Sequence, residues 1–118
     1  MDEYLILMRL DLITKEAQPS PEQLQQYMQQ YQNWVATLTA QGRFVGGTGL
    51  STEGRVLKSG HMVLDGPFAE TKESLAGFIT IRARDFDEAV SWAQACPILR
   101  AAGNSVEVRQ ISTLHELE

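Results

Sequence analysis

The chain has 118 residues, of which 43% are apolar and 21% charged, a composition typical of one globular domain with its own core. Its net charge is −5, whereas nucleic-acid-binding proteins usually carry a basic excess, so direct binding of DNA or RNA is not expected. No apolar run approaches the roughly 20 residues that span a bilayer, and the acidic start Met1-Asp2-Glu3 is unlike a secretory signal. Cys96 is the single cysteine and excludes an internal disulfide, so we expect a cytoplasmic protein.

The first predicted elements are a strand and a long helix. Residues Tyr4–Leu10 form a short apolar run, which predicts a buried strand. A helix start follows, in which Ser20 can act as cap, Pro21 suits the first turn and Gln23 can close a capping box. Gly42 supplies a stop for this helix. Between start and stop, apolar residues recur at spacings of three and four and predict one buried helix face: Leu24, Tyr27, Met28, Tyr31, Trp34, Val35 and Leu38.

Short strands and turns occupy the middle of the chain. Arg43–Val45 begins a strand that a run of glycines soon interrupts, where we expect a bulge or a close approach at a dimer seam. Arg55–Leu57 and His61–Leu64 predict two further short strands joined by a turn. Asp65-Gly66-Pro67 predicts another turn directly after them.

The last third of the chain predicts a strand, a helix and a strand. Gly77–Ala83 alternates in the manner of a strand, and Asp85 then opens a helix that Cys96-Pro97 ends. Ser105–Ile111 is the last predicted strand. Two helices covering one face of an antiparallel sheet would give a ferredoxin-like α+β fold.

Strand alternation predicts that the two faces of this sheet differ. The aliphatic positions should meet the helices: Ile79, Ile81, Val106 and Val108. The other face then carries a mixed aromatic and charged set: Phe78, Thr80, Arg82, Glu107 and Arg109. Such a face is either a solvated surface with weak ion pairs or the contact surface of a second copy, which would leave a cleft lined by arginines and acids.

The stretch Asp65–Glu73 is the most unusual in the sequence, because a turn runs directly into a dense set of charges. Asp65 could act as a general acid or base, or serve only as a turn residue and cap. Glu70, Lys72 and Glu73 could orient a polar ligand or form a solvated turn. His61 lies four strand positions from Asp65, roughly 13 Å along one strand, so a surface histidine is favoured over a direct pair.

Other kinds of site find little support. The glycine run at 46–49 lacks the Lys-Ser/Thr of a phosphate-binding loop, and Cys96 precedes a proline without an evident base. The spacing of His, Cys and carboxylates predicts no metal centre and no Ser–His–Asp triad. We therefore expect no metal and no cofactor.

The residues Val63–Glu73, followed by Leu75-Ala76-Gly77-Phe78, resemble the signature of the YCII-related proteins, in the branch called DGPF-domain proteins. The resemblance implies a single domain over residues 1–118 that dimerises through its sheets as a dimeric α+β barrel, with a pocket near the DGPF segment. The shorter YCII branch has a His–Asp pair proposed as an active site. By spacing, the position of its histidine falls near Tyr31, and this helix contains no histidine. Acid–base chemistry of that kind is therefore not expected here. The resemblance also suggests a link to transcription control, because genes of DGPF proteins are often neighbours of genes for extracytoplasmic-function sigma factors.

The sequence as a whole favours a cytoplasmic homodimer that binds a small polar or aromatic molecule in a cleft beside Asp65, the candidate catalytic residue. The alternative is a non-catalytic interaction module linked to sigma-factor-dependent transcription control. Whether a reaction is catalysed stays open. The expected ligand-binding residues are His61, Glu70, Lys72, Glu73, Phe78, Arg82, Arg109 and Tyr31.

Overall fold

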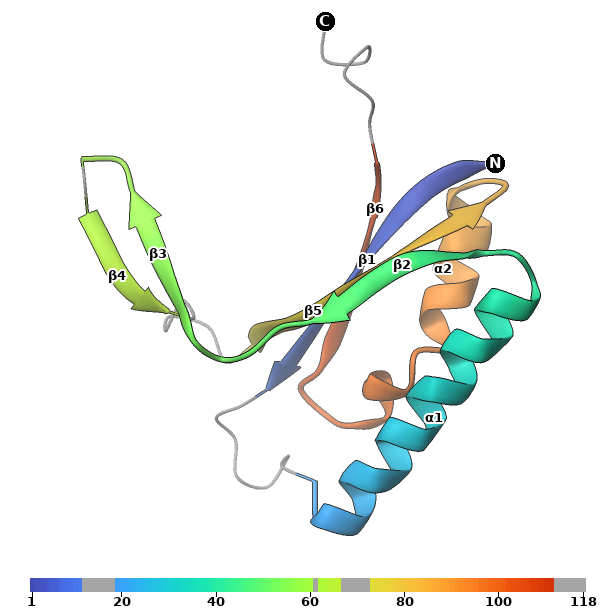
Figure 1. Ribbon diagram of the computed structural model, residues 1–118, viewed down its shortest axis with the longest axis horizontal. Coiled ribbons are helices and arrows are strands. Elements are labelled where there is room, and N and C mark those ends of the chain that lie inside the picture. Colours follow the sequence, from blue (N-terminus) through green and yellow to red (C-terminus); the bar gives the residue numbers. More distant parts are fainter. Residues whose placement is uncertain (12–18, 61, 67–72, 112–118) are drawn as a thin grey trace, which may run out of the picture.

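A four-stranded antiparallel sheet with two helices on one face forms the body of the protein (Figure 1). The computed structural model describes residues 1–11, 19–60, 62–66 and 73–111. The strand order is β2-β5-β1-β6, and the helices α1 and α2 follow β1 and β5 in the chain. This is the predicted ferredoxin-like topology. The bounds are β1 Asp2–Asp11, α1 Pro21–Ala40, β2 Phe44–Gly49, β5 Glu73–Ala83, α2 Phe86–Gln94 and β6 Ser105–Gln110.

A hairpin is inserted between β2 and β5. Its strands, β3 (Gly54–Lys58) and β4 (Met62–Gly66), form a separate two-stranded sheet. Figure 1 shows this hairpin extending from the body on the side of the sheet opposite α1 and α2. Asp65 and Gly66 lie in β4 and pair with Arg55 and Gly54 of β3. The start of the predicted Asp-Gly-Pro turn is therefore strand, because β3 is long enough to pair with it.

Both helices begin with the predicted caps. At α1 the Gln23 N–H donates to Ser20 Oγ (3.2 Å), and the Ser20 N–H donates to Gln23 Oε1 (2.9 Å), which completes the capping box. At α2 the Glu88 N–H donates to Asp85 Oδ1 (2.8 Å). A short 3₁₀ helix, η2 (Pro97–Arg100), follows α2 and was not foreseen from the sequence.

The core lies between the sheet and the helices, on the face that the alternation predicted. Trp34 anchors α1 there, because its Nε1–H donates to the Trp92 carbonyl oxygen at 3.1 Å. β1, whose inner side the sequence left unassigned, also turns alternate residues inward. The buried residues of the core are Tyr4, Ile6, Met8, Trp34, Leu38, Ile79, Ile81, Ala83, Ala89, Ala93 and Cys96.

Glycines hold β2 close to β5. A Cβ on Gly47 would lie 2.5 Å from the Phe78 carbonyl oxygen, and one on Gly77 would lie 2.8 Å from that of Thr48. The pairing shifts register between Phe44 and Gly46, which is the bulge that the sequence predicted. β2 continues through the glycines to Gly49, and these glycines permit β2 to approach β5 closely within one chain. The expected close approach at a dimer seam stays a prediction.

Candidate functional site

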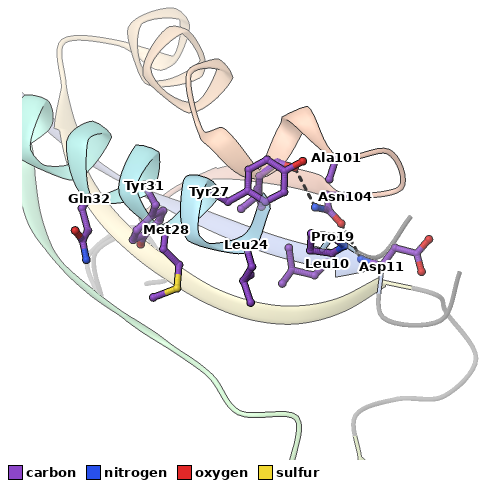
Figure 2. A pocket seen from close by; sticks show the side chains of 11 residues that line it. Leu10, Asp11, Pro19, Leu24, Tyr27, Met28, Tyr31, Gln32, Ala101 and Asn104 are labelled. Carbon is purple, nitrogen blue, oxygen red and sulfur yellow. Dashed lines mark hydrogen bonds between the residues drawn. The ribbon is translucent and has the colours of Figure 1, made fainter. Parts of the chain in front are cut away.

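A cavity of about 460 Å³ lies between the first half of α1, η2 and the end of β1 (Figure 2). Its volume falls within the range of about 300–1,000 Å³ that is usual for small-molecule sites. Its walls come from segments that are far apart in the sequence and meet on the helix side of the sheet. The lining residues are Leu10, Asp11, Pro19, Leu24, Tyr27, Met28, Tyr31, Gln32, Ile98, Ala101 and Asn104.

The wall supplied by α1 is apolar and aromatic. Leu24 and Met28 belong to the predicted apolar helix face, yet they are 50% and 57% exposed, because this half of the helix lies over the cavity instead of the core. Tyr27 extends from α1 toward the segment that carries Ala101 and Asn104 (Figure 2). The Tyr31 ring packs against Trp34 at a centroid distance of 5.8 Å, which fixes its orientation at the inner end of this wall.

The opposite wall is polar and held by side chain–backbone hydrogen bonds. Asn104 Oδ1 accepts from the Asp11 N–H (2.8 Å), and Asn104 Nδ2 donates to the Ile98 carbonyl oxygen (3.0 Å), so one amide ties β1 to η2. Asp11 is only 8% exposed. Gly103 has a φ of +86°, and a Cβ there would lie 2.7 Å from Asp11 Oδ2. Only glycine therefore suits this turn, which brings the Asn104 amide to the Asp11 N–H.

The titratable groups in and behind the cavity favour uncharged hydrogen-bonding chemistry. Burial, reinforced by the nearby Cys96, raises the pKa of Tyr31, so its phenol stays protonated at neutral pH and can donate a hydrogen bond. Burial raises the pKa of the Cys96 thiol to about 11, which leaves it a poor nucleophile. Among the described lining residues Asp11 is the one carboxylate, and none is basic.

One residue of the DGPF signature pairs with a strand residue that lines this cavity. Glu73, which ends the charged stretch Asp65–Glu73 of the signature, begins β5 and pairs with Asp11, the last residue of β1. The side chains of Asp65 and Glu73 lie outside the described residues, as do His61, Glu70 and Lys72 altogether. The backbone register places Glu73 of the signature next to Asp11, which lines the cavity.

Three of the other predicted ligand-binding residues lie on the far side of the sheet from Tyr31. Phe78 is half-buried there, Arg82 Nε lies 3.7 Å from Glu3 Oε2, and Arg109 Nη1 lies 3.2 Å from Glu107 Oε2. Within one chain, Tyr31 and this group cannot contact the same small molecule, because the sheet separates them. We call this side the open face; its residues are Glu3, Leu5, Leu7, Arg9, Thr48, Phe78, Thr80, Arg82, Glu107 and Arg109.

Ion pairs organise the open face near β6. Glu107 accepts from Arg109 Nη1 and, at 2.8 Å, from Arg9 Nη1, and these hydrogen bonds lower the pKa of Glu107. The pairs are partly exposed, so each contributes little to stability. They leave the centre of the face to Leu5, Leu7 and Phe78, which are each half-buried.

The sequence profile of the YCII-related domain matches residues 8–115. The chain belongs to the YCII-related family. The resemblance seen in the signature is thereby confirmed. An uncharacterised protein of Rhizobium meliloti (strain 1021) is 43% identical over 51 residues, which are 43% of this chain and 41% of that protein. The chain thus matches about two fifths of the length of this curated relative.

A solved structure also resembles this YCII-related chain. It is the 5-chloro-2-hydroxyhydroquinone dehydrochlorinase of Burkholderia phenoliruptrix AC1100 in complex with 2,5-dihydroxybenzoquinone. The comparison has a TM-score of 0.44 and 20% identity, and covers 96% of this chain and 97% of that one. A likeness of this degree says nothing about the activity of this chain.

Residues 1–11, 19–60, 62–66 and 73–111 of this YCII-related protein hold neither a cluster of metal ligands nor a membrane-spanning helix. In these ranges no three His, Cys, Asp or Glu side chains lie close enough together to hold a metal ion. Nor does any helix in them have the length and apolar character needed to cross a membrane.

Sequence reasoning missed Asp11 and Asn104. Asp11 follows the apolar strand directly, and a carboxylate at the end of a buried strand is the signal that could have marked it. Asn104 was read only as part of a turn, although an amide after glycine can bond backbone groups on two neighbouring segments. Both residues make contacts between distant parts of the chain, and the alternation of apolar and polar residues along a strand does not reveal such contacts.

Proposed function

We propose that this YCII-related protein is a cytoplasmic homodimer that binds a small, uncharged aromatic molecule in the cavity between α1, η2 and the end of β1. The observation that carries the proposal is the pairing of Glu73 with Asp11, because it joins the charged stretch of the family signature to the cavity wall. The cavity also has the size, the aromatic wall and the few fixed polar groups that small-molecule sites share.

The chemistry of the lining selects the ligand class. Tyr27, Met28 and Tyr31 offer faces and edges suited to a planar ring, and sulfur and aromatic groups make favourable contacts with rings. The protonated Tyr31 hydroxyl can donate to a carbonyl or phenolic oxygen of the ligand. A carboxylate or phosphate ligand is disfavoured, because none of the described lining residues is basic.

The open face supports the homodimer. The register places the apolar residues Leu5, Leu7 and Phe78 next to one another at its centre, and no described element covers them. Its charges have both signs, with Glu3 beside Arg82 and Glu107 beside Arg109. A face with mixed charges can complement a two-fold copy of itself, in which each acidic group meets a basic one.

A panel of neutral phenols and their matching benzoates, measured by thermal shift and calorimetry, tests the ligand site. We expect phenols to raise the melting temperature and benzoates to leave it unchanged. Tyr31→Phe keeps the ring and removes one hydrogen bond, so it should weaken phenol binding by about three- to tenfold. Ala101→Phe should abolish binding by filling the cavity, whereas Ala102→Phe, an exposed neighbour outside the lining, should not.

The results distinguish the cavity from the other candidate binding sites. Binding that survives Ala101→Phe but is lost in Arg82→Ala would move the site to the open face. Loss in Asp65→Asn alone would give the signature residue the main role. The alternative role as a module linked to a sigma factor predicts a stable protein partner in a pull-down and no phenol binding; a phenol bound with no stable partner excludes it.

A further inference from the structure

The hairpin of β3 and β4, which we call the arm (Gly54–Gly66), stands apart from the body of the protomer. Its two strands pair with each other and, among the described residues, with no strand of the four-stranded sheet. Figure 1 shows the arm on the side of the sheet opposite the helices, which is the side of the open face. A two-stranded hairpin without packing on either side is marginally stable in water.

One cross-strand pair of the arm is apolar and exposed. Leu57 pairs with Val63, and the two side chains are 74% and 59% exposed. Such pairs normally stabilise a sheet by packing against a further layer, and here the protomer supplies none in its described parts. The arm therefore has the character of an element that is completed by contact with another molecule.

Exposed apolar residues also connect the base of the arm to the open face. Leu75 pairs with Arg9, so the register places it on the open face, and it is 37% exposed. Leu50, which leads from β2 toward the arm, is 44% exposed, and its N–H donates to the Ala76 carbonyl oxygen at 2.7 Å. A partner that covers Leu7 and Phe78 would thus meet Leu75, Leu50 and then the arm in one continuous surface.

We propose that the arm docks on a second copy of this chain and buries Leu57 and Val63 against it, at the margin of the interface that the two open faces form. The inference rests on the proposed homodimer and extends it. A second copy is the favoured occupant because the arm and the open face lie on the same side and are joined by Leu75 and Leu50. In a two-fold dimer each arm then reaches the partner, and both arms are covered at once.

Sedimentation velocity over a range of protein concentrations tests this assignment. Leu57→Asp and Val63→Asp place a charge at the exposed pair, and each should raise the dimer dissociation constant by about ten- to a hundredfold. Both side chains are exposed in the protomer, so the circular dichroism of the variants should match the parent protein. Leu99→Asp is the matched control, since Leu99 is 41% exposed but lies on η2, on the helix side, and should leave the constant unchanged.

Photo-crosslinking provides the second measurement and keeps the arm distinct from the dimer. A photoreactive phenylalanine derivative replaces Leu57 in isotopically light chains, which are mixed with heavy chains before irradiation. We expect crosslinks between light and heavy chains. If the parent protein dimerises but neither arm variant weakens it and crosslinks stay within one chain, the arm proposal is overturned and the homodimer stands. A parent protein that is monomeric at all concentrations overturns both.

Discussion

The two faces of the sheet come from the same strands but differ in how deeply their side chains are buried. On the covered face Ile6, Ile79 and Ile81 are fully buried under α1 and α2. On the open face their direct neighbours Leu5, Phe78 and Thr80 are only half-buried. The covered face forms the core of the chain, whereas the open face and the arm leave apolar side chains partly or largely exposed. Period-two alternation is enough to generate this division.

The largest expected effect separates two adjacent residues of β1. Ile6→Ala leaves a void in the core and should lower the free energy of unfolding by about 2–5 kcal/mol. Leu5→Ala changes the open face, so at low protein concentration it should lower that free energy by much less. Urea denaturation at low and high protein concentration measures both.

The same experiment shows whether a second copy covers Leu5. A dimer contributes to stability in proportion to the logarithm of protein concentration, so the loss caused by Leu5→Ala should grow as the concentration rises. The loss caused by Ile6→Ala should hardly change. Equal losses for the two variants at low concentration would contradict the division between covered and open faces.

A smaller effect is expected from two adjacent glycines of β2. Gly47 is opposite Ile79, and a Cβ there would lie 2.6 Å from Ile79 Cγ2 and 2.5 Å from the Phe78 carbonyl oxygen. Gly47→Ala should therefore push β2 away from β5 and cost about 1–3 kcal/mol of unfolding free energy. Gly46, opposite Thr80, has nothing within 4 Å of the corresponding position, so Gly46→Ala is the matched control. Amide hydrogen exchange along β2 would locate the change; a loss of equal size in both variants would refute the steric account.

How far the sequence could predict this structure depended on the range of the interaction. Local rules gave the Ser20 capping box, the Asp85 cap and the inward side of β5 correctly, since each depends on residues a few positions apart. The ferredoxin-like topology followed from element order and from the family signature. The close approach of Gly47 to β5 was out of reach, because it depends on the pairing of two strands about thirty residues apart.

The candidate site was less predictable than the fold for the same reason. Tyr31 was named, but as the counterpart of a histidine in related proteins, and its place in a cavity wall depends on η2 and the end of β1. Asp11 and Asn104 are 93 positions apart and meet through a single hydrogen bond. Leu24 and Met28 were read as core residues, because helical periodicity identifies an apolar face without showing whether a core or a cavity lies beneath it.

The smallest expected effect is on the pH dependence of stability, and it concerns Glu88 on α2 and Glu107 on the open face. Burial alone would raise the pKa of Glu88, but hydrogen bonds from Arg84 and the nearby Arg43 and Arg84 charges lower it. The pKa of Glu107 is lowered by hydrogen bonds from Arg109 and Arg9. Both carboxyls therefore bind protons more readily in the unfolded chain, so their contribution to stability is present above the ordinary value of 4.5 and is lost as pH falls through the folded value.

Unfolding measured between about pH 3 and 7, with Glu88→Gln and Glu107→Gln beside the parent protein, should show a flatter acid limb for each variant. Salt distinguishes the two sites. The Glu88 side chain is 11% exposed and that of Glu107 is 40% exposed, so about 1 M salt, with a screening length of about 3 Å, should reduce the Glu107 contribution more. If the open faces pair in a dimer, Glu107 is shielded from salt. The difference in salt sensitivity between the Glu88 and Glu107 contributions should then narrow as protein concentration rises. A difference that is independent of concentration would mean that no partner covers the ion pairs of the open face.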